Sequence, residues 1–208
     1  VIGAGQMGAG IAQVAAQAGF DVLLRDVDAA LAEKGKAGIA KRLQRAVEGG
    51  KLDAAAADAA LARITPIGEV APFSTCDLVI EAATEREEVK RAIFGEVAPL
   101  LGATAILASN TSSIPITRLA QASQDPARFI GVHFEDMGRD WRGTMHRVYE
   151  FLGLDIRPAM PKMVEDQRRT RRGRRSPHHY SLEQFGLRPG RVLDELGEYM
   201  RSYDISRD

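Results

Sequence analysis

The sequence predicts an α/β fold with a doubly wound, mainly parallel sheet, followed by a short, mostly helical C-terminal segment. Buried apolar runs of strand length alternate with helical patterns as far as Phe134, and a glycine-rich turn joins the first run to the first helix. Beyond this point the composition changes and arginines cluster. We therefore expect one domain over residues 1–134 and a separate, Arg-rich helical segment over residues 135–208.

Composition excludes several classes of partner. The chain of 208 residues carries 28 basic and 28 acidic side chains, so its net charge indicates neither nucleic acid nor an anionic membrane as a partner. No apolar run approaches the roughly 20 residues that cross a bilayer. Cys76 is the only cysteine and no signal peptide is visible, so we expect a cytoplasmic protein without an internal disulfide. Because the chain opens at Val1 inside an apolar run, we also expect a fragment whose first strand lacks its opening residues.

A G-x-G-x-x-G pattern lies between the first apolar residues and the first predicted helix, "AGIAQVAAQAG". Each glycine has a physical task in such a pattern. Gly3 permits the tight turn, Gly5 lets the backbone approach a pyrophosphate, and Gly8 lets the helix pack closely on the strand. The helix N-terminus supplies N–H donors and positive potential for phosphates. The pattern therefore predicts a dinucleotide site.

An acidic residue stands where such a site needs one. The predicted strand "FDVLLRD" ends on Asp26, which follows Gly8 by 18 positions. A carboxylate at this distance accepts hydrogen bonds from ribose hydroxyls and repels a 2′-phosphate, so Asp26 favours NAD over NADP. Arg25 beside it weakens this preference. A surface aspartate at a strand end is the alternative interpretation.

The remaining elements continue the alternation. "RITPIGEV", "CDLVIEAA", "TAILASNTSS" and "RFIGVHF" predict further strands. Thr84 and Glu87 fit a capping box that opens a helix through "EREEVKRAIFGEVAPLL", and Val89, Ile93 and Val97 give this helix an apolar stripe. Ligands bind beyond the carboxyl ends of parallel strands. The polar residues at these ends are Asp26, Glu85, residues 109–113 and His133.

Four segments together resemble a known family. "VIGAGQMGAGIAQVAAQAGFDVLLRDVD", "DLVIEAATEREEVKRAIF", "ASNTSSIPITRLA" and "RFIGVHF" are similar, in order and spacing, to the Rossmann-type NAD-binding domain of the 3-hydroxyacyl-CoA dehydrogenases, in particular the bacterial 3-hydroxybutyryl-CoA dehydrogenases. The resemblance covers residues 1–134. It implies NAD as the cofactor, an acyl-CoA as the substrate, and oxidation of a (3S)-hydroxyacyl-CoA to the 3-ketoacyl-CoA in fatty-acid metabolism.

The resemblance also implies roles for single residues on the cofactor side. Gln6 and Met7, in the Q-M-G form of the glycine loop, belong to the cofactor site. Glu85 and Lys90 contact the nicotinamide half of the cofactor. From the residues alone, Lys90 could equally be a solvated helix lysine, and Glu85 an ordinary acid in the first turn of a helix.

On the substrate side, the resemblance makes Ser112 a contact of both the cofactor and the substrate's 3-hydroxyl, and His133 the general base. An imidazole that titrates near neutral pH suits removal of the hydroxyl proton. Ser112 has a competing role as a turn or helix-cap residue. His133 has the alternative of a packed or surface histidine.

After His133 the sequence departs from the family pattern. The family places a glutamate twelve residues beyond the histidine, where it orients the imidazole, and this position holds Met145. The position of the family's asparagine holds Asp136. The resemblance implies a helical domain that completes the acyl-CoA site and forms the homodimer, and we expect this domain to be missing from the chain. An NAD-binding module without turnover is therefore a second hypothesis.

The C-terminal segment resembles a different family. "FEDMGRDWRGTMHRVYEFLGLD" and "HHYSLEQFGLRPGRVLDELGEYMRSYDI" are similar to the C-terminal end of bacterial sulfotransferase-family proteins, so a sulfotransferase-related chimera is a third hypothesis. The first stretch predicts a helix that ends at Gly153. Its apolar stripe is Trp141, Met145, Val148, Tyr149 and Leu152, and a last helix has the stripe Val192, Leu196, Tyr199 and Tyr203.

Two further features of this segment concern binding. The run "RRTRRGRR" over residues 168–175 is expected to be a solvated loop, with bidentate binding of a phosphate or sulfate as the alternative. His178 and His179 lack cysteines or carboxylates at metal-ligand spacing, so we predict no metal site.

Overall fold

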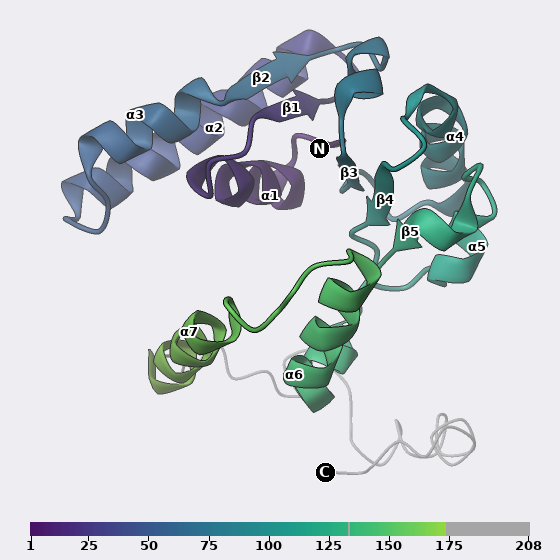
Figure 1. Cartoon of the computed structure of the whole chain (residues 1–208). Coiled ribbons are helices and arrows are strands. Elements are labelled where there is room, and N and C mark those ends of the chain that lie inside the picture. Colours follow the sequence, from purple (N-terminus) through teal and green to yellow (C-terminus); the bar gives the residue numbers. More distant parts are fainter. Residues whose placement is uncertain (133, 174–208) are drawn as a thin grey trace, which may run out of the picture. The chain divides into compact units, whose positions relative to one another are not determined.

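The computed structural model describes residues 1–132 and 134–173 of the chain (Figure 1). The chain divides into two compact units, Val1–Val148 and Tyr149–Asp208, and the first unit contains the sheet. Helix α6 (Phe134–Phe151) begins at the domain boundary that we predict and continues past residue 148. The boundary at residue 134 therefore stays a prediction.

The sheet is parallel throughout the described residues. Its strands are β1 (Val22–Arg25), β2 (Ile64–Ile67), β3 (Leu78–Glu81), β4 (Ile106–Ser109) and β5 (Phe129–Ile130). β1 pairs with β2, β3 with β4, and β4 with β5. Ile2 joins the two groups, because it forms parallel bridges to Arg25 and to Glu81. The resulting order, β2–β1–Ile2–β3–β4–β5, confirms the predicted doubly wound sheet.

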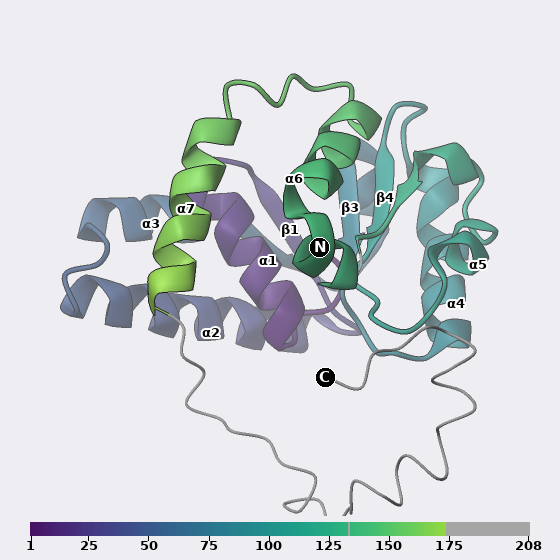
Figure 2. The same cartoon turned by 90° about the horizontal axis from the view of Figure 1, so that it is seen from below.

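Helices and two hydrophobic cores surround this sheet. The helices of the first unit, besides α6, are α1 (Gln6–Gln17), α2 (Ala29–Glu48), α3 (Ala54–Ala62), α4 (Glu87–Val97), α5 (Ile116–Ala120), and the short 3₁₀ turns η1 (Ala71–Thr75), η2 (Ala98–Leu100) and η3 (Pro126–Arg128). Figures 1 and 2 show α1 to α3 around β1 and β2, and α4 and α5 beside β3 to β5. Val22 and Leu24 belong to the first core, which contains residues of α1, α2 and α3. Leu23 packs against the second core, which contains residues of α4 and α5. Because successive side chains of a strand point to opposite faces, β1 supplies both cores.

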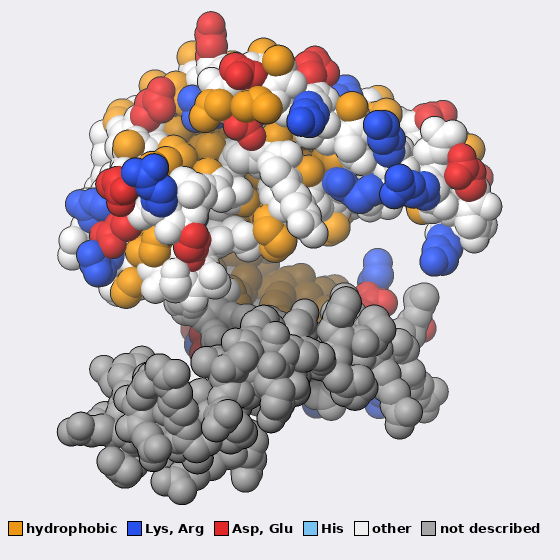
Figure 3. All heavy atoms as spheres, turned by 180° about the vertical axis from the view of Figure 1, so that it is seen from behind, with side chains coloured by type: hydrophobic (Ala, Val, Ile, Leu, Met, Phe, Trp, Pro, Cys, Tyr) orange, Lys and Arg blue, Asp and Glu red, His pale blue; other side chains and the backbone are white. Residues whose placement is uncertain are grey.

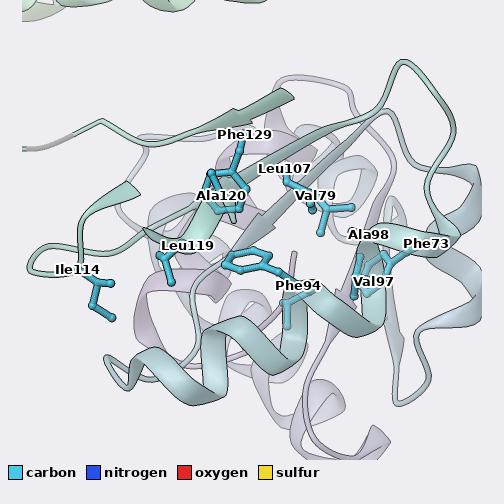
Figure 4. Close-up of a cluster of buried hydrophobic side chains, with 11 residues drawn as sticks. Phe73, Val79, Phe94, Val97, Ala98, Leu107, Ile114, Leu119, Ala120 and Phe129 are labelled. Carbon is cyan, nitrogen blue, oxygen red and sulfur yellow. The ribbon is translucent and has the colours of Figure 1, made fainter. Parts of the chain in front are cut away.

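The second core fixes α4 to the sheet (Figure 4). Phe94 of α4 meets Phe129 of β5 edge to face, with the ring centroids 4.8 Å apart. Both rings are buried. Full burial of a side chain of this size stabilises a fold by about 1.5–3 kcal/mol. The residues between β3 and α4 are therefore held at both of their ends.

Two helices that the sequence pattern did not predict, α2 and α3, lie between β1 and β2, and an aspartate caps each of them. Asp28 caps α2 by accepting the N–H of Leu31 at 2.8 Å, and Asp53 caps α3 by accepting the N–H of Ala55 at 2.9 Å. In the part of the chain that the structure describes, β2 then pairs only with β1. Pro66, which has no N–H to donate, fits in β2 because edge strands tolerate proline.

The start of α4 differs from its prediction. The capping box is wrong: Arg86 is the N-cap, no side chain caps the helix, and the Glu87 carboxylate lies 2.7 Å from Nη2 of Arg118. The fully buried positions of α4 are Lys90, Phe94 and Val97, so the buried face is rotated from the predicted stripe. A lysine can occupy that face because it finds a buried carboxylate, as described below.

The predicted helix after residue 134 is confirmed as α6, although it is broken once. Asp140 leaves the helical conformation (φ −146°, ψ 78°) and its carboxylate accepts the N–H of Gly143 at 3.0 Å, which restarts the helix. At the other end Gly153 has φ 66°, and the N–H of Leu154 donates to the carbonyl of Tyr149 at 2.8 Å. A positive φ at such a glycine closes a helix, as predicted.

Helix α7 (Met160–Gly173) corrects the loop predicted for the Arg-rich run. Residues 168–173 continue this helix, because arginine is a good helix former. The remainder of the run, His178, His179 and the predicted last helix lie outside the described residues. On the face shown in Figure 3, acidic and basic side chains occur side by side over the first unit. No helix within residues 1–132 and 134–173 is long and apolar enough to span a membrane.

Candidate dinucleotide site

The glycine loop has the close contacts that its spacing predicts. Gly3 has φ 97°, and a Cβ on it would lie 2.5 Å from the carbonyl oxygen of Ala82. A Cβ on Gly8 would collide with the carbonyl oxygen of Gly3. At Gly5 a Cβ would meet no atom within 4 Å. Gly3 and Gly8 therefore permit the turn and the packing of α1, while the space beside Gly5 is open to a ligand.

The N-terminus of α1 adjoins this loop without a competing side chain. Its N-cap is Gly5, no side chain caps it, and its first turn has no acidic residue. Gln6 and Met7 form the beginning of the first turn and both are exposed. The first N–H groups of a helix and its dipole together attract an anion. This end of the site fits a phosphate group.

Asp26 is held against the glycine loop. Its Oδ2 accepts the N–H of Ala4 at 2.6 Å, and its Oδ1 accepts the N–H of Val27 at 2.8 Å. Each oxygen retains acceptor capacity for a hydroxyl. Arg25 turns elsewhere: its Nε donates to the carbonyl of Gly68 at 3.3 Å, and its Nη2 lies 4.0 Å from Glu96. The Arg25 guanidinium is therefore engaged by Gly68 and Glu96.

Glu85 accepts hydrogen bonds from the loop that follows β4. Its Oε1 accepts the Thr111 hydroxyl at 2.6 Å, the Ser112 N–H at 2.8 Å, and both the N–H and the hydroxyl of Ser113 at 3.0 Å. Partial burial raises the pKa of Glu85, but these hydrogen bonds outweigh it and lower the pKa to about 2. Glu85 is therefore ionised at neutral pH. The structure thus brings together two predicted site residues, Glu85 and Ser112.

Lys90 is buried and paired with a residue that the sequence analysis missed. Its Nζ lies 2.8 Å from each carboxylate oxygen of Glu81, the last residue of β3, and 3.6 Å from Oε2 of Glu85. The interpretation of Lys90 as a solvated lysine is wrong. Its side chain is only 1% exposed, so the ammonium is covered in this structure. The signal for Glu81 was a charged residue within the apolar run "CDLVIEAA" that predicts β3.

The predicted base, His133, lies outside the described residues. Met145 and Asp136, which replace two polar residues of the family pattern, both lie in α6. Met145 is half-buried, and Asp136 is exposed, its carbonyl accepting the Thr144 hydroxyl at 3.1 Å. Within the described ranges, no group of three His, Cys, Asp or Glu side chains could hold a metal ion.

Comparison with known proteins matches the same part of the chain. The family described as "3-hydroxyacyl-CoA dehydrogenase, NAD binding domain" matches residues 1–136. A 3-hydroxybutyryl-CoA dehydrogenase of Bradyrhizobium diazoefficiens is 54% identical over 134 residues, which are 64% of this chain and 46% of the relative. A 3-hydroxyadipyl-CoA dehydrogenase of Escherichia coli is 45% identical over 134 residues, 64% of this chain and 28% of the relative.

Solved structures agree with these relatives. The crystal structure of FadB2 from Mycobacterium tuberculosis aligns with a TM-score of 0.62 and 45% identity, covering 64% of this chain and 47% of that one. The chain thus spans about half the length of several relatives and less of others. The likeness of residues 135–208 to sulfotransferases gains no support from these comparisons.

Proposed function

The chain belongs to the family of 3-hydroxyacyl-CoA dehydrogenase NAD-binding domains, and from this premise we propose that it forms the cofactor half of an oxidoreductase acting on a (3S)-hydroxyacyl-CoA. The bond from the Ala4 N–H to Asp26 carries the proposal. It joins the glycine loop to the ribose-binding carboxylate, so one rigid unit recognises both a pyrophosphate and a ribose.

Each part of the cofactor has residues suited to it. The pyrophosphate would approach Gly5 and the N–H groups of Gln6 and Met7 at the start of α1, where no side chain competes. The adenosine ribose would bind Asp26. We exclude a 2′-phosphate because Asp26 repels it and Arg25 is engaged by Gly68 and Glu96. NAD is therefore the expected cofactor, in preference to NADP.

The substrate side of the proposed reaction uses Glu85, Ser112 and His133. Oxidation of a secondary alcohol removes a hydride from carbon and a proton from the hydroxyl, and bound NAD supplies the hydride acceptor. His133 takes the hydroxyl proton, because a neutral imidazole is a suitable base near pH 7. The Ser112 hydroxyl orients the alcohol oxygen, and Glu85 holds the Ser112 backbone by accepting its N–H at 2.8 Å.

A second candidate function is an NAD-binding module without turnover. The observation that favours it is Met145, a thioether in the place where the family pattern has the carboxylate that orients the base. A thioether is only a weak hydrogen-bond acceptor, so it does not stabilise an imidazolium. In that case the chain binds NADH but does not reduce acetoacetyl-CoA.

Cofactor binding tests the proposal. We expect the purified chain to bind NADH at least about 10-fold more tightly than NADPH, and 3′-phosphoadenosine-5′-phosphate more weakly than either. Asp26→Ala should reduce NADH affinity by about 10-fold and remove most of the preference over NADPH, because the ribose loses its acceptor and the 2′-phosphate its repulsion. A folded chain that does not bind NADH would refute both candidate functions.

Turnover then separates the two candidates. With acetoacetyl-CoA and NADH as substrates, an active dehydrogenase oxidises NADH, and His133→Ala abolishes that activity by removing the base. NADH binding without oxidation selects the binding module. Turnover that His133→Ala leaves unchanged would refute the assigned base.

A further inference from the structure

A buried ion pair lies beside the carboxylate of Glu85. Glu81 closes β3 and Lys90 lies in the first turn of α4, and their side chains are 0% and 1% exposed. Nζ of Lys90 lies 2.8 Å from both oxygens of Glu81. The Ser109 hydroxyl donates to Oε2 of Glu81 at 2.6 Å, and the Ala83 N–H donates to Oε1 at 2.7 Å. Each oxygen of Glu81 thus accepts from two donors.

The ion pair continues to the candidate site through Glu85. An ammonium has three N–H donors, and Glu81 engages Lys90 with two oxygens. The distance from Nζ to Oε2 of Glu85 is 3.6 Å, which is an ion pair without a close hydrogen bond. Oε1 of Glu85 accepts all the hydrogen bonds from residues 111–113. Glu85 is therefore held by the loop on one oxygen and by the charge of Lys90 on the other.

The balance between these two attractions depends on Glu81. A buried charge without a partner is strongly unfavourable. Without the Glu81 carboxylate, Glu85 would be the nearest counterion of the Lys90 ammonium. The ammonium would then draw Oε2 from 3.6 Å to hydrogen-bond distance and pull Oε1 away from the N–H groups of Ser112 and Ser113. Glu81 prevents this because both of its carboxylate oxygens accept hydrogen bonds from the ammonium at 2.8 Å.

We propose that Glu81 is a positioning residue for the cofactor site, which holds Lys90 so that Glu85 stays on residues 111–113 and keeps Ser112 in place. The inference rests on the proposed function, in which Glu85 and Ser112 face the nicotinamide half of NAD. Lys90 then acts through Glu85 and does not itself touch the cofactor, because its ammonium is buried and held by Glu81.

A double-mutant cycle on NADH affinity tests this route. We expect Glu81→Gln and Glu85→Gln each to weaken NADH binding by about 10-fold, and the two together to weaken it no more than about 2-fold beyond Glu85→Gln alone. Hydrogen exchange supplies a readout without cofactor: the amides of Ser112 and Ser113 should exchange faster in Glu81→Gln. Additive effects on affinity, or unchanged exchange at these two amides, would overturn the proposal.

Two further variants separate positioning from general destabilisation. Glu81→Gln/Lys90→Met removes both buried charges, so it remains informative if Glu81→Gln does not fold. Because no ammonium then remains to draw Glu85 away from residues 111–113, we expect NADH affinity and amide exchange within about 2-fold of wild type, and a loss as large as that expected for Glu81→Gln in this folded variant would overturn the proposal. Leu43→Ala opens a cavity in the other core and should lower the melting temperature with NADH affinity unchanged.

The outcomes also distinguish this inference from the proposed function. A folded wild-type chain that does not bind NADH refutes the proposed function, and the exchange measurement then still decides whether Glu81 controls residues 111–113. If the wild-type chain binds NADH and the Glu81→Gln chain binds it equally tightly, only the inference is refuted.

Discussion

The two ends of the candidate site are built by different kinds of interaction. The glycine end, which consists of Gly3, Gly5, Gly8 and Asp26, depends on backbone geometry: close contacts allow no Cβ at two positions, and two backbone N–H groups fix the carboxylate. The carboxylate end consists of Glu81, Glu85, Lys90, Ser109 and residues 111–113. It depends on side chains that come from two strands and a helix, and on charges withdrawn from water.

This difference determines how each end responds to a substitution. At the glycine end a change acts through the space that an added atom requires. At the carboxylate end a change acts through the charge that remains after a partner is removed. The glycines of the first end should therefore be sensitive to the size of an added side chain, and the buried groups of the second end to the loss of a charge. The predictions below test this distinction, beginning with the largest expected effect.

Removal of the ammonium should be the most destabilising change. Lys90→Met leaves the Glu81 carboxylate buried with no other cation of residues 1–132 or 134–173 within 4 Å, which costs about 3–5 kcal/mol of unfolding free energy. Urea denaturation at pH 7 measures the loss. The matched variant Glu81→Gln/Lys90→Met removes both charges and should lose at least about 2 kcal/mol less than Lys90→Met. Equal losses in the two variants would contradict the charge-based description of this end.

We expect a smaller loss of stability from an added methyl group at the glycine end. Gly8→Ala places a methyl group against the carbonyl oxygen of Gly3, so the loop or the helix has to move, at a cost of about 1–3 kcal/mol. Gly10→Ala is the matched control in the same helix, because its Cβ would meet no atom within 4 Å. Alanine is the better helix former, so this control should be neutral or more stable by up to about 1 kcal/mol. Thermal unfolding of the two variants compares them, and a Gly8→Ala chain as stable as wild type would contradict the packing role.

The same difference explains which end the sequence could predict. The spacing of Gly3, Gly5 and Gly8, with Asp26 at the end of the next strand, is local and characteristic, so the turn, the helix and the strand before Asp26 follow from it. Glu81 and Lys90 are nine residues apart on different elements, and no short spacing relates them. Their pairing depends on how α4 packs against β3, and for this reason the predicted stripe of α4 placed Lys90 off the buried face.

The Arg-rich run shows the same limit at the other end of the chain. Its composition indicated a solvated loop, because a row of like charges disfavours compact packing. Residues 168–173 are nevertheless helical, since arginine loses little side-chain freedom in a helix and α7 already begins at Met160. Composition alone therefore did not predict the backbone conformation of residues 168–173.

The smallest predicted effect is the dependence of stability on the ionisation of Glu85. Its pKa is about 2 in the folded chain, where residues 111–113 donate to the ionised form, against an ordinary value of 4.5. A carboxyl with a lowered folded pKa stabilises the fold fully above the unfolded pKa, and this contribution is lost as the pH falls from about 4.5 toward 2. Because the side chain is 39% exposed, solvent screening limits the contribution to roughly 1 kcal/mol.

The difference in unfolding free energy between wild type and Glu85→Gln should therefore be constant from pH 7 to pH 5 and shrink below that. Glu88 and Asp155 also have lowered pKa values, but they are present in both chains and cancel in the difference. A difference that persists unchanged down to pH 2 would contradict the charge-based description of the carboxylate end.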